Sequence, residues 1–246
     1  MGQRSSNRSS QRHSEGRLSS NHYRDDEETS GIQRVNVKRL KCAEVTLRKN
    51  QKYILQLLQT RSLTFLIGPA GTGKTFLPVL HAVDKLKRGE IKKIVAVRPA
   101  VEAGDSIGYL TGGLSEKMAP YLRPVLDAFE KILGKPQLDM LLREGIIEIT
   151  SLTYLRGRTI EDAVYIMDEM QNATPAQLKM ALTRIGENCT AVVTMDPQQC
   201  DIPKAESCIT DLARFEASPD IPVFRFATVD VVRSEIVKTI LQVYEE

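Results

Sequence analysis

The eight residues from Gly68 to Thr75 constrain the fold of this chain more than any other stretch. Their sequence is GPAGTGKT, and they stand between the apolar run LTFLI and a segment with helical periodicity. Glycines let the backbone wrap around an anion with successive N–H groups pointing inward, and a following helix adds its positive end. A strand before the loop and a helix after it favour a phosphate-binding loop over a chance glycine-rich turn. The stretch therefore predicts a nucleotide-phosphate site on an α/β scaffold.

The side chains of this loop predict its chemistry. Lys74 is expected to reach the β- and γ-phosphates, and the Thr75 hydroxyl is expected to bind Mg²⁺. The predicted nucleotide-binding residues are the loop and the residue after it, namely Gly68, Pro69, Ala70, Gly71, Thr72, Gly73, Lys74, Thr75 and Phe76.

Short apolar runs alternate with helical segments along most of the chain. Strands are predicted at 63–67, 93–98, 146–150, 163–167, 190–195 and 223–227, and helices at 46–60, 74–88, 119–133, 175–185, 207–216 and 231–243. Apolar runs of this length between helices are typical of a parallel sheet covered on both faces. The predicted fold class is α/β: a doubly wound, mainly parallel sheet with helices on both faces.

Composition divides the chain into a tail and one domain. Residues 1–34 are rich in Ser, Arg and Asn, so we expect them to be disordered, and residues 35–246 are expected to form the phosphate-loop domain. Five arginines of the tail precede an acidic block at 25–28. The tail is either an electrostatic arm for RNA or DNA or a solubilising extension, and we favour the extension.

Overall charge and cysteine content exclude few classes of protein. The net charge is +3, so a nucleic acid would have to meet a local basic face. The four cysteines form no C-x-x-C pair, which indicates reduced thiols. No apolar run approaches the roughly 20 residues of a membrane span, and the N-terminus lacks a secretory pattern. We therefore expect a cytoplasmic protein without a membrane partner.

A second motif, AVYIMDE, places two carboxylates after a buried strand. Asp168 emerges at the carboxyl end of this predicted strand, where α/β sheets place their ligands, and is expected to bind Mg²⁺. Glu169 follows and can polarise an attacking water, which favours hydrolysis over transfer to another substrate. Two carboxylates that cap the next turn are the alternative.

Polar residues elsewhere provide weaker signals. In AVVTMDPQQCDIP, Gln199 can contact the γ-phosphate and Asp196 can assist the metal or the water, although a structural turn around Pro197 explains the same composition. Gln51 precedes Gly68 by 17 residues and can pair with adenine, but by sequence alone it is more simply an exposed helical residue. The following basic residues together suggest an anionic polymer and an arginine finger: Arg98, Arg123, Arg156, Arg158, Lys179, Arg184, Arg225 and Arg233. Arg233 is the first choice for the finger, and Arg156 or Arg158 the second.

Six ordered motifs resemble the PhoH family of ATPases over about residues 40–246. They are GPAGTGKT, VRPAVEAGDSIGYLTGGLSEKMAPYLRPVLDAF, LRGRT, MDEMQNATPAQLKMALTRIG, DPQQCDIP and DVVRSEIV. The resemblance implies a single RecA-like domain that binds ATP and Mg²⁺, assembles into rings, commonly hexamers, and associates with RNA. It also implies an arginine that reaches the neighbour's nucleotide, and it makes Gln51 an expected adenine reader. The short form suits a phage-encoded member.

The chain departs from the family pattern at three positions. Met170 and Met195 stand where Ala and Gly are usual, and Ser234 replaces a His. Met195 is expected beside the γ-phosphate, and Met170 is expected to affect the position of Glu169. The leading hypothesis is an Mg²⁺-dependent ATPase that moves on or remodels RNA, with single-stranded DNA as the other polymer. The second is a nucleotide-responsive assembly protein with little hydrolysis, and a small-molecule kinase is weaker.

Overall fold

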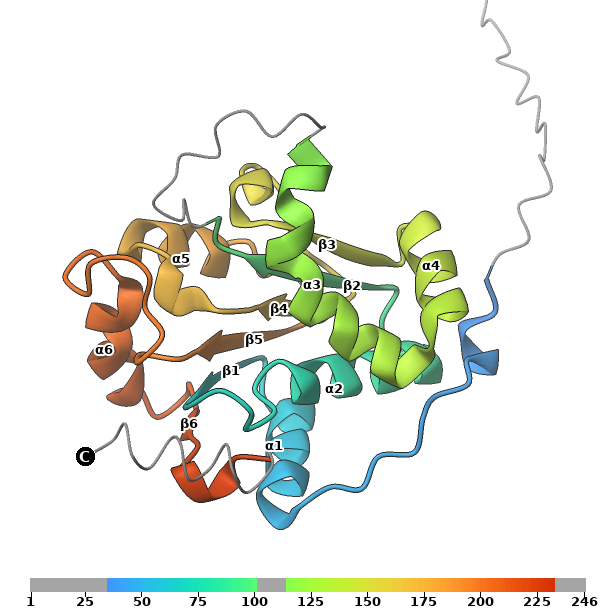
Figure 1. The fold of residues 1–246 in the computed structure, drawn as a ribbon, viewed down its shortest axis with the longest axis horizontal. Helices are drawn as coiled ribbons and strands as arrows, with labels where there is room; N and C mark the ends of the chain where they lie inside the picture. Colours follow the sequence, from blue (N-terminus) through green and yellow to red (C-terminus); the bar gives the residue numbers. More distant parts are fainter. Residues whose placement is uncertain (1–34, 101–113, 233–246) are drawn as a thin grey trace, which may run out of the picture. The chain divides into compact units, whose positions relative to one another are not determined.

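The structure is a computed structural model that describes residues 35–100 and 114–232, with side chains from 121 onward in the second range. Six strands form one sheet in the order β3-β2-β4-β5-β1-β6, and all five pairings are parallel (Figure 1). The strands are β1 Leu63–Ile67, β2 Lys93–Arg98, β3 Ile147–Ser151, β4 Ala163–Met167, β5 Cys189–Met195 and β6 Val223–Arg225. The predicted α/β class with a parallel sheet is confirmed.

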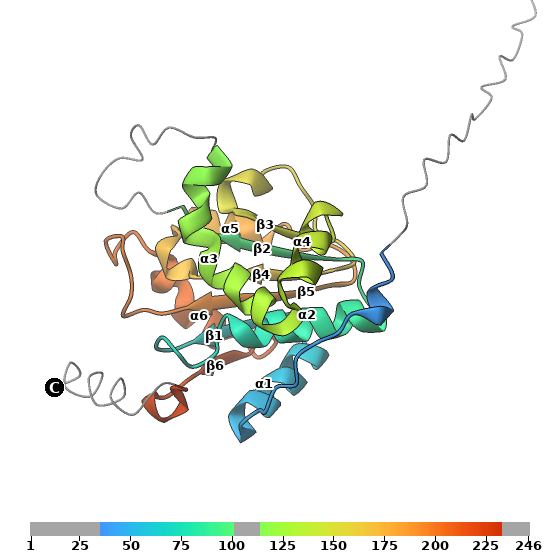
Figure 2. The same cartoon turned by 45° about the vertical axis from the view of Figure 1, so that its right-hand side comes forward.

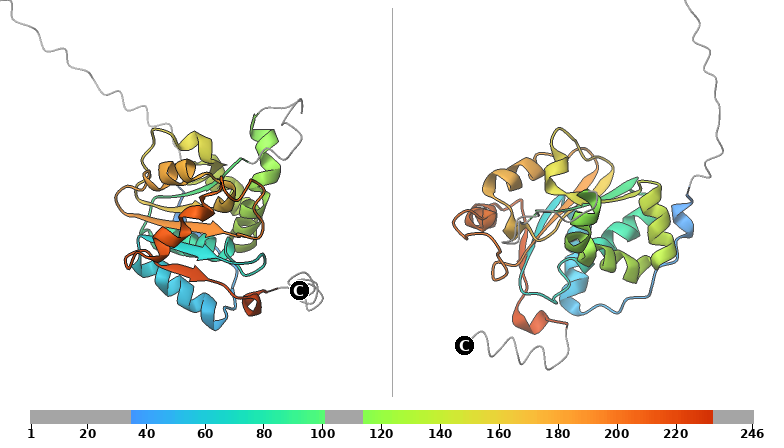
Figure 3. Two further views of the ribbon diagram at one scale, coloured as in Figure 1. Left: turned by 90° about the vertical axis from the view of Figure 1, so that its left-hand side faces the viewer. Right: turned by 45° about the horizontal axis from the view of Figure 1, so that its top comes forward.

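Helices cover both faces of the sheet, as Figures 2 and 3 show from three further directions. One face carries α1, α2, α3 and α4, and the other carries α5 and α6. The α-helices are α1 Lys49–Thr60, α2 Phe76–Arg88, α3 Leu114–Leu133, α4 Lys135–Arg143, α5 Pro175–Leu182 and α6 Leu212–Glu216. Single 3₁₀ turns are η1 Val37–Arg39, η2 Leu152–Leu155, η3 Met170–Asn172, η4 Cys208–Asp211 and η5 Thr228–Asp230.

The two central strands are buried along their whole length, so their side chains alternate between two cores. Every residue of β4 and of β5 is buried. Tyr165 and Val193 belong to the core beneath α5 and α6, whereas Val164 and Ile166 belong to the core beneath α2, α3 and α4. A run of consecutive apolar residues is therefore required in each strand, because both of its faces are covered.

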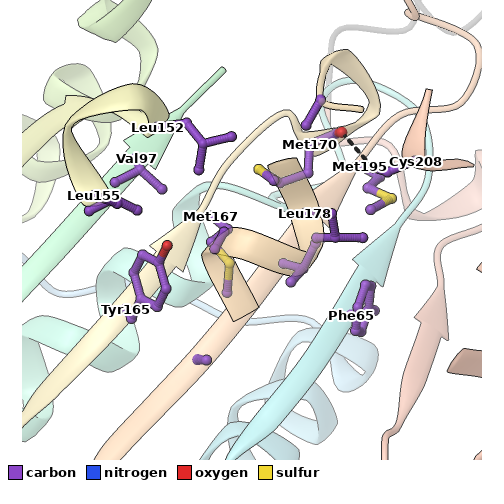
Figure 4. Packing of buried hydrophobic residues seen from close by; sticks show 14 of the residues in the cluster. Phe65, Val97, Leu152, Leu155, Tyr165, Met167, Met170, Leu178, Met195 and Cys208 are labelled. Atoms are coloured by element: carbon purple, nitrogen blue, oxygen red, sulfur yellow. Dashed lines mark hydrogen bonds between the residues drawn. The ribbon is translucent and has the colours of Figure 1, made fainter. Parts of the chain in front are cut away.

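The core beneath α5 also contains the two methionines that depart from the family pattern (Figure 4). Met170 and Met195 are both 0% exposed and pack with Phe65, Met167 and Leu178. The expectation that Met195 stands beside the γ-phosphate was wrong. Successive side chains of a strand point to opposite faces, and this alternation directs Met195 into the core.

Several helix ends differ from the predicted ones by two to five residues, and two regions differ more. The predicted helix 207–216 is a 3₁₀ turn followed by the short α6. Helix α4 was missed, because Pro136 and the charged residues of KPQLDMLLR obscure its periodicity. Gly134 separates it from α3 with φ 73°, and Pro136 lies in its first turn, where no backbone donor is needed. The tail 1–34 and all but the first two residues of the predicted helix 231–243 lie outside the described residues, and those two are not helical.

Two further features concern the class of protein. All four cysteines lie in the described part of the chain, and all are free thiols. Within residues 35–100 and 114–232, none of the helices combines the length and the apolar character that crossing a bilayer requires.

The burial of Met195 predicts a stability role for its side chain. Met195→Ala should lower the free energy of unfolding by about 2–5 kcal/mol, because it leaves a cavity in a packed core. Urea denaturation followed by circular dichroism measures this change. The control is Val229→Ala. The side chain of Val229 is 80% exposed, so this substitution should change the free energy of unfolding by less than about 0.5 kcal/mol. Equal effects of the two substitutions would contradict the placement of Met195.

Candidate active site

The loop from Gly68 to Thr75 joins β1 to α2, and its glycines are needed for different reasons. A Cβ atom at Gly68 would lie 2.6 Å from the Cβ of Phe226, so only glycine lets the C-terminal segment pass this closely. Gly73 has φ 94°, a conformation that side chains disfavour. Within the loop, the Thr72 hydroxyl donates to the Pro69 carbonyl over 3.0 Å. The loop is thereby held as an open curve ahead of α2.

Lys74 is held inside this curve. Its side chain is 6% exposed, and Nζ lies 3.0 Å from the Pro69 carbonyl oxygen and 3.6 Å from Oδ2 of Asp196. Asp196 was expected to assist the metal or the attacking water, but here its buried carboxylate is the counter-ion of Lys74. Its position at the end of β5, beside the loop strand β1, accounts for this pairing.

The carboxylate of Asp168 lies at the centre of the site. It is fully buried at the end of β4, and its Oδ1 accepts hydrogen bonds from the hydroxyls of Thr75 at 2.8 Å and Thr194 at 2.7 Å. Oδ2 accepts no hydrogen bond and lies 3.3 Å from Nε of Arg98. Burial raises the pKa of Asp168, while the Arg98 charge and the two hydroxyls act to lower it.

This arrangement fits the Mg²⁺ site that the sequence predicts at Thr75 and Asp168. Mg²⁺ prefers oxygen ligands and is usually held by one or two carboxylates together with phosphate oxygens. The structure supplies a loop hydroxyl, an adjacent carboxylate, and a buried carboxylate oxygen without a hydrogen-bond donor.

Glu169 is fixed in an unusual backbone conformation. Its φ is 55°, in the left-handed region that non-glycine residues rarely adopt, and such strain is frequent at functional sites. The Glu169 N–H donates to the Thr194 hydroxyl over 3.1 Å, and its carboxylate accepts from Gln171 and lies 3.7 Å from a terminal nitrogen of Arg98. These contacts direct the carboxylate toward the phosphate loop.

Gln171 connects the surrounding elements, and the sequence did not single it out. Its side chain is 0% exposed, and its Nε2 donates to the Glu169 carboxylate and to the Gln199 carbonyl. Its Oε1 accepts from the N–H of Asp196 over 2.9 Å. Gln171 therefore joins the acidic pair to the end of β5 and to the loop that carries Gln199.

A cavity of about 750 Å³ brings most of the predicted residues together. Its walls include Lys74, Thr75, Glu169, Gln199 and Arg98, so the two separate motifs and the β5 loop face one space.

A second cavity of about 530 Å³ adjoins the first, because Gly71, Gly73, Phe76 and Lys131 line both. Gln51 lies in its wall, and its Nε2 would be 3.4 Å from a Cβ at Gly73. Its Oε1 accepts from the Arg48 N–H over 3.0 Å. Gln51 thus contacts the loop and is not a remote surface residue.

The arginines that the sequence suggested for a finger or for an anionic partner differ in their contacts. Arg233 lies outside the described residues. Arg158 forms two hydrogen bonds with the carboxylate of Glu148, and Arg225 pairs with Glu216, so both engage their own chain. Arg156 is exposed.

Several known proteins are similar to this chain in sequence. Residues 45–245 match the family model described as PhoH-like protein. The chain belongs to this family. A PhoH-like protein of Bacillus subtilis is 46% identical over 198 residues, which cover 80% of this chain and 62% of that protein. One from Synechocystis is 38% identical, covering 89% of this chain and 68% of that protein. Protein PhoH of Escherichia coli K12 is 40% identical, covering 79% and 56%.

The PhoH-like chain thus spans about three fifths of the length of several curated relatives. Among solved structures, Pif1 helicase from Candida albicans aligns with a TM-score of 0.37 and 18% identity, covering 74% of this chain and 40% of that one. The sheet itself defines the fold: β5 separates the strand of the phosphate loop, β1, from the strand of the acidic pair, β4. The domain is therefore a parallel α/β sheet with a phosphate-loop sequence at the end of β1.

The contacts of Gln171 predict that it matters for stability. Gln171→Leu should leave the Asp196 N–H and the Gln199 carbonyl without their partner, lowering the free energy of unfolding by about 1–3 kcal/mol. Urea denaturation measures this change. Gln198→Leu, at an exposed neighbouring glutamine, is the control and should match the wild type. An unchanged Gln171→Leu protein would contradict this role.

Proposed function

We propose that this PhoH-like chain is an Mg²⁺-dependent ATPase that acts on single-stranded RNA as a ring of identical subunits. One observation carries the ATPase proposal: Lys74, Thr75 and Glu169 line one cavity, and Asp168 is hydrogen-bonded to Thr75 at its edge. These are the parts that P-loop enzymes use to bind a triphosphate and activate water. Gln51 in the adjoining cavity favours adenine as the base.

The residues would act in a defined order. An incoming triphosphate is wrapped by the loop N–H groups, and Lys74 exchanges Asp196 for the β- and γ-phosphates. Thr75 and Asp168 would hold Mg²⁺, which neutralises part of the phosphate charge when bound. Glu169 accepts a proton from the attacking water, and Gln171 keeps its carboxylate in place. Gln199, in the cavity wall, can contact the terminal phosphate.

The proposed ring is supported by the small number of arginines at the phosphate cavity among the described residues. The wall of the phosphate cavity contains one arginine, Arg98, and it is already paired with Asp168 and Glu169. Lys131 also lines this cavity, so what a neighbouring subunit would add is an arginine finger rather than a first extra cation, and Arg233 is the candidate. RNA is proposed over DNA on family grounds, and a cytoplasmic site of action is part of the same proposal.

The assembly-protein alternative loses its main support. It was motivated by Met195 beside the γ-phosphate and by Met170 next to Glu169, and both side chains lie in the core. An ATP-dependent change in particle mass, with wild-type turnover no faster than that of Glu169→Gln, would nevertheless favour it.

Two substitutions test the proposed chemistry. Lys74→Ala should abolish nucleotide binding, since the phosphates lose their cation. Glu169→Gln should retain binding but lower turnover by about 10²–10⁴-fold, because the general base is lost. Phosphate release with and without single-stranded RNA measures turnover, and fluorescent ATP measures binding. The matched control is Lys92→Ala, whose side chain is 83% exposed. Full turnover by Lys74→Ala would show that the site is assigned to the wrong residues.

A further inference from the structure

Arg98 occupies a position in the site that the proposed reaction does not by itself explain. It is the last residue of β2, and its side chain is only 15% exposed. Its Nε lies 3.3 Å from Oδ2 of Asp168, and one terminal nitrogen lies 3.7 Å from Oε1 of Glu169. The other terminal nitrogen donates to the Tyr121 carbonyl of α3. The guanidinium is therefore held between a helix and both members of the acidic pair.

The oxygen that Arg98 faces is the one left available for a metal. Oδ1 of Asp168 already accepts two hydroxyl hydrogen bonds, whereas Oδ2 is buried and accepts none. A buried carboxylate without a nearby cation is costly, and Arg98 provides the cation. A second cation placed on the same oxygen would be repelled by the first.

We propose that Arg98 is a built-in counter-ion that excludes free divalent cations from Asp168, so that the metal enters the site only together with a triphosphate. The proposal deepens the proposed function and rests on it for the identity of the triphosphate. Arg98 is a positioning residue in this account, because it acts through the two carboxylates.

The charges of the site are consistent with such exclusion. In the structure the carboxylates of Asp168 and Glu169 share Arg98, and that of Asp196 is paired with Lys74. Each carboxylate therefore has a cation within 4 Å, so a lone Mg²⁺ meets carboxylates that are already paired. A triphosphate adds several negative charges and engages Lys74, which restores the attraction for the metal.

A different role for Arg98 would be to stabilise transition-state charge directly, from within the same subunit. That role makes no demand on metal binding by the nucleotide-free protein, whereas exclusion requires the nucleotide-free wild type to bind the metal weakly. The two roles are therefore separated by a measurement made without nucleotide.

The test is a Mn²⁺ titration of the full chain without nucleotide, followed by electron paramagnetic resonance. The wild type should bind Mn²⁺ weakly, and Arg98→Gln should bind it about tenfold or more tightly, on the scale by which one adjacent charge alters a carboxylate. The matched control is Arg158→Gln, which also removes an arginine paired with a carboxylate but lies outside the cavity. It should bind Mn²⁺ as weakly as the wild type. Equal affinity of Arg98→Gln and wild type would overturn the proposal.

Melting curves provide a second readout. Arg98→Gln should melt at a lower temperature in EDTA, and millimolar Mg²⁺ should restore much of the loss, because the metal replaces the missing cation. Arg158→Gln should lose stability that Mg²⁺ does not restore. An Arg98→Gln loss that is insensitive to Mg²⁺ would indicate a purely structural arginine and would count against the proposal.

If Arg98→Gln fails to fold, a measurement on the wild type alone still tests the proposal. It should bind Mn²⁺ far more tightly with a non-hydrolysable ATP analogue than without nucleotide, beyond the binding of Mn²⁺ by the analogue alone. Tight Mn²⁺ binding by the nucleotide-free wild type would overturn the proposal. Since the decisive titrations need no hydrolysis, their failure is distinguishable from the failure of the ATPase assignment.

Discussion

The buried carboxylate of Asp168 is the interaction on which the rest of the site depends. A charge removed from water is tolerated only where hydrogen bonds and a nearby cation compensate for lost hydration. Here Thr75 comes from the phosphate loop, Thr194 from β5 and Arg98 from β2, and all three contact the one carboxylate at the end of β4. The position of Asp168 therefore fixes where the phosphate loop and the ends of β2, β4 and β5 lie relative to one another.

Several other features follow from this placement. Thr194 must face Asp168, so the alternation of β5 sends Met195 into the opposite core. The same hydroxyl accepts the Glu169 N–H, and this bond helps to hold Glu169 in its left-handed conformation. Gln171 then completes the arrangement by linking Glu169 to the backbone of Asp196. The methionines that replace smaller family residues are accommodated as core side chains, away from the phosphate cavity.

The sequence predicted the parts of the site that reside in local patterns. The loop between a strand and a helix and the carboxylates at the end of an apolar run lie where they were expected. The partners of these groups were not predictable, because they depend on strand order. Lys74 contacts Asp196 because β1 and β5 are neighbouring strands, and Arg98 contacts Asp168 because β2 and β4 are neighbouring strands. Local spacing also does not reveal the buried amide of Gln171. Helix α4 was missed because its short sequence contains a proline.

The central claim is that the cavity at the phosphate loop binds a magnesium-bound triphosphate through the loop and the Asp168 carboxylate. Isothermal titration calorimetry of the full chain with a non-hydrolysable ATP analogue tests it most directly, with Mg²⁺ and with EDTA. The account predicts saturable heat that is stronger with Mg²⁺ for the wild type, and a much smaller Mg²⁺ effect for Asp168→Asn. Absence of saturable heat for well-folded wild-type protein, or an undiminished Mg²⁺ effect in Asp168→Asn, would contradict it.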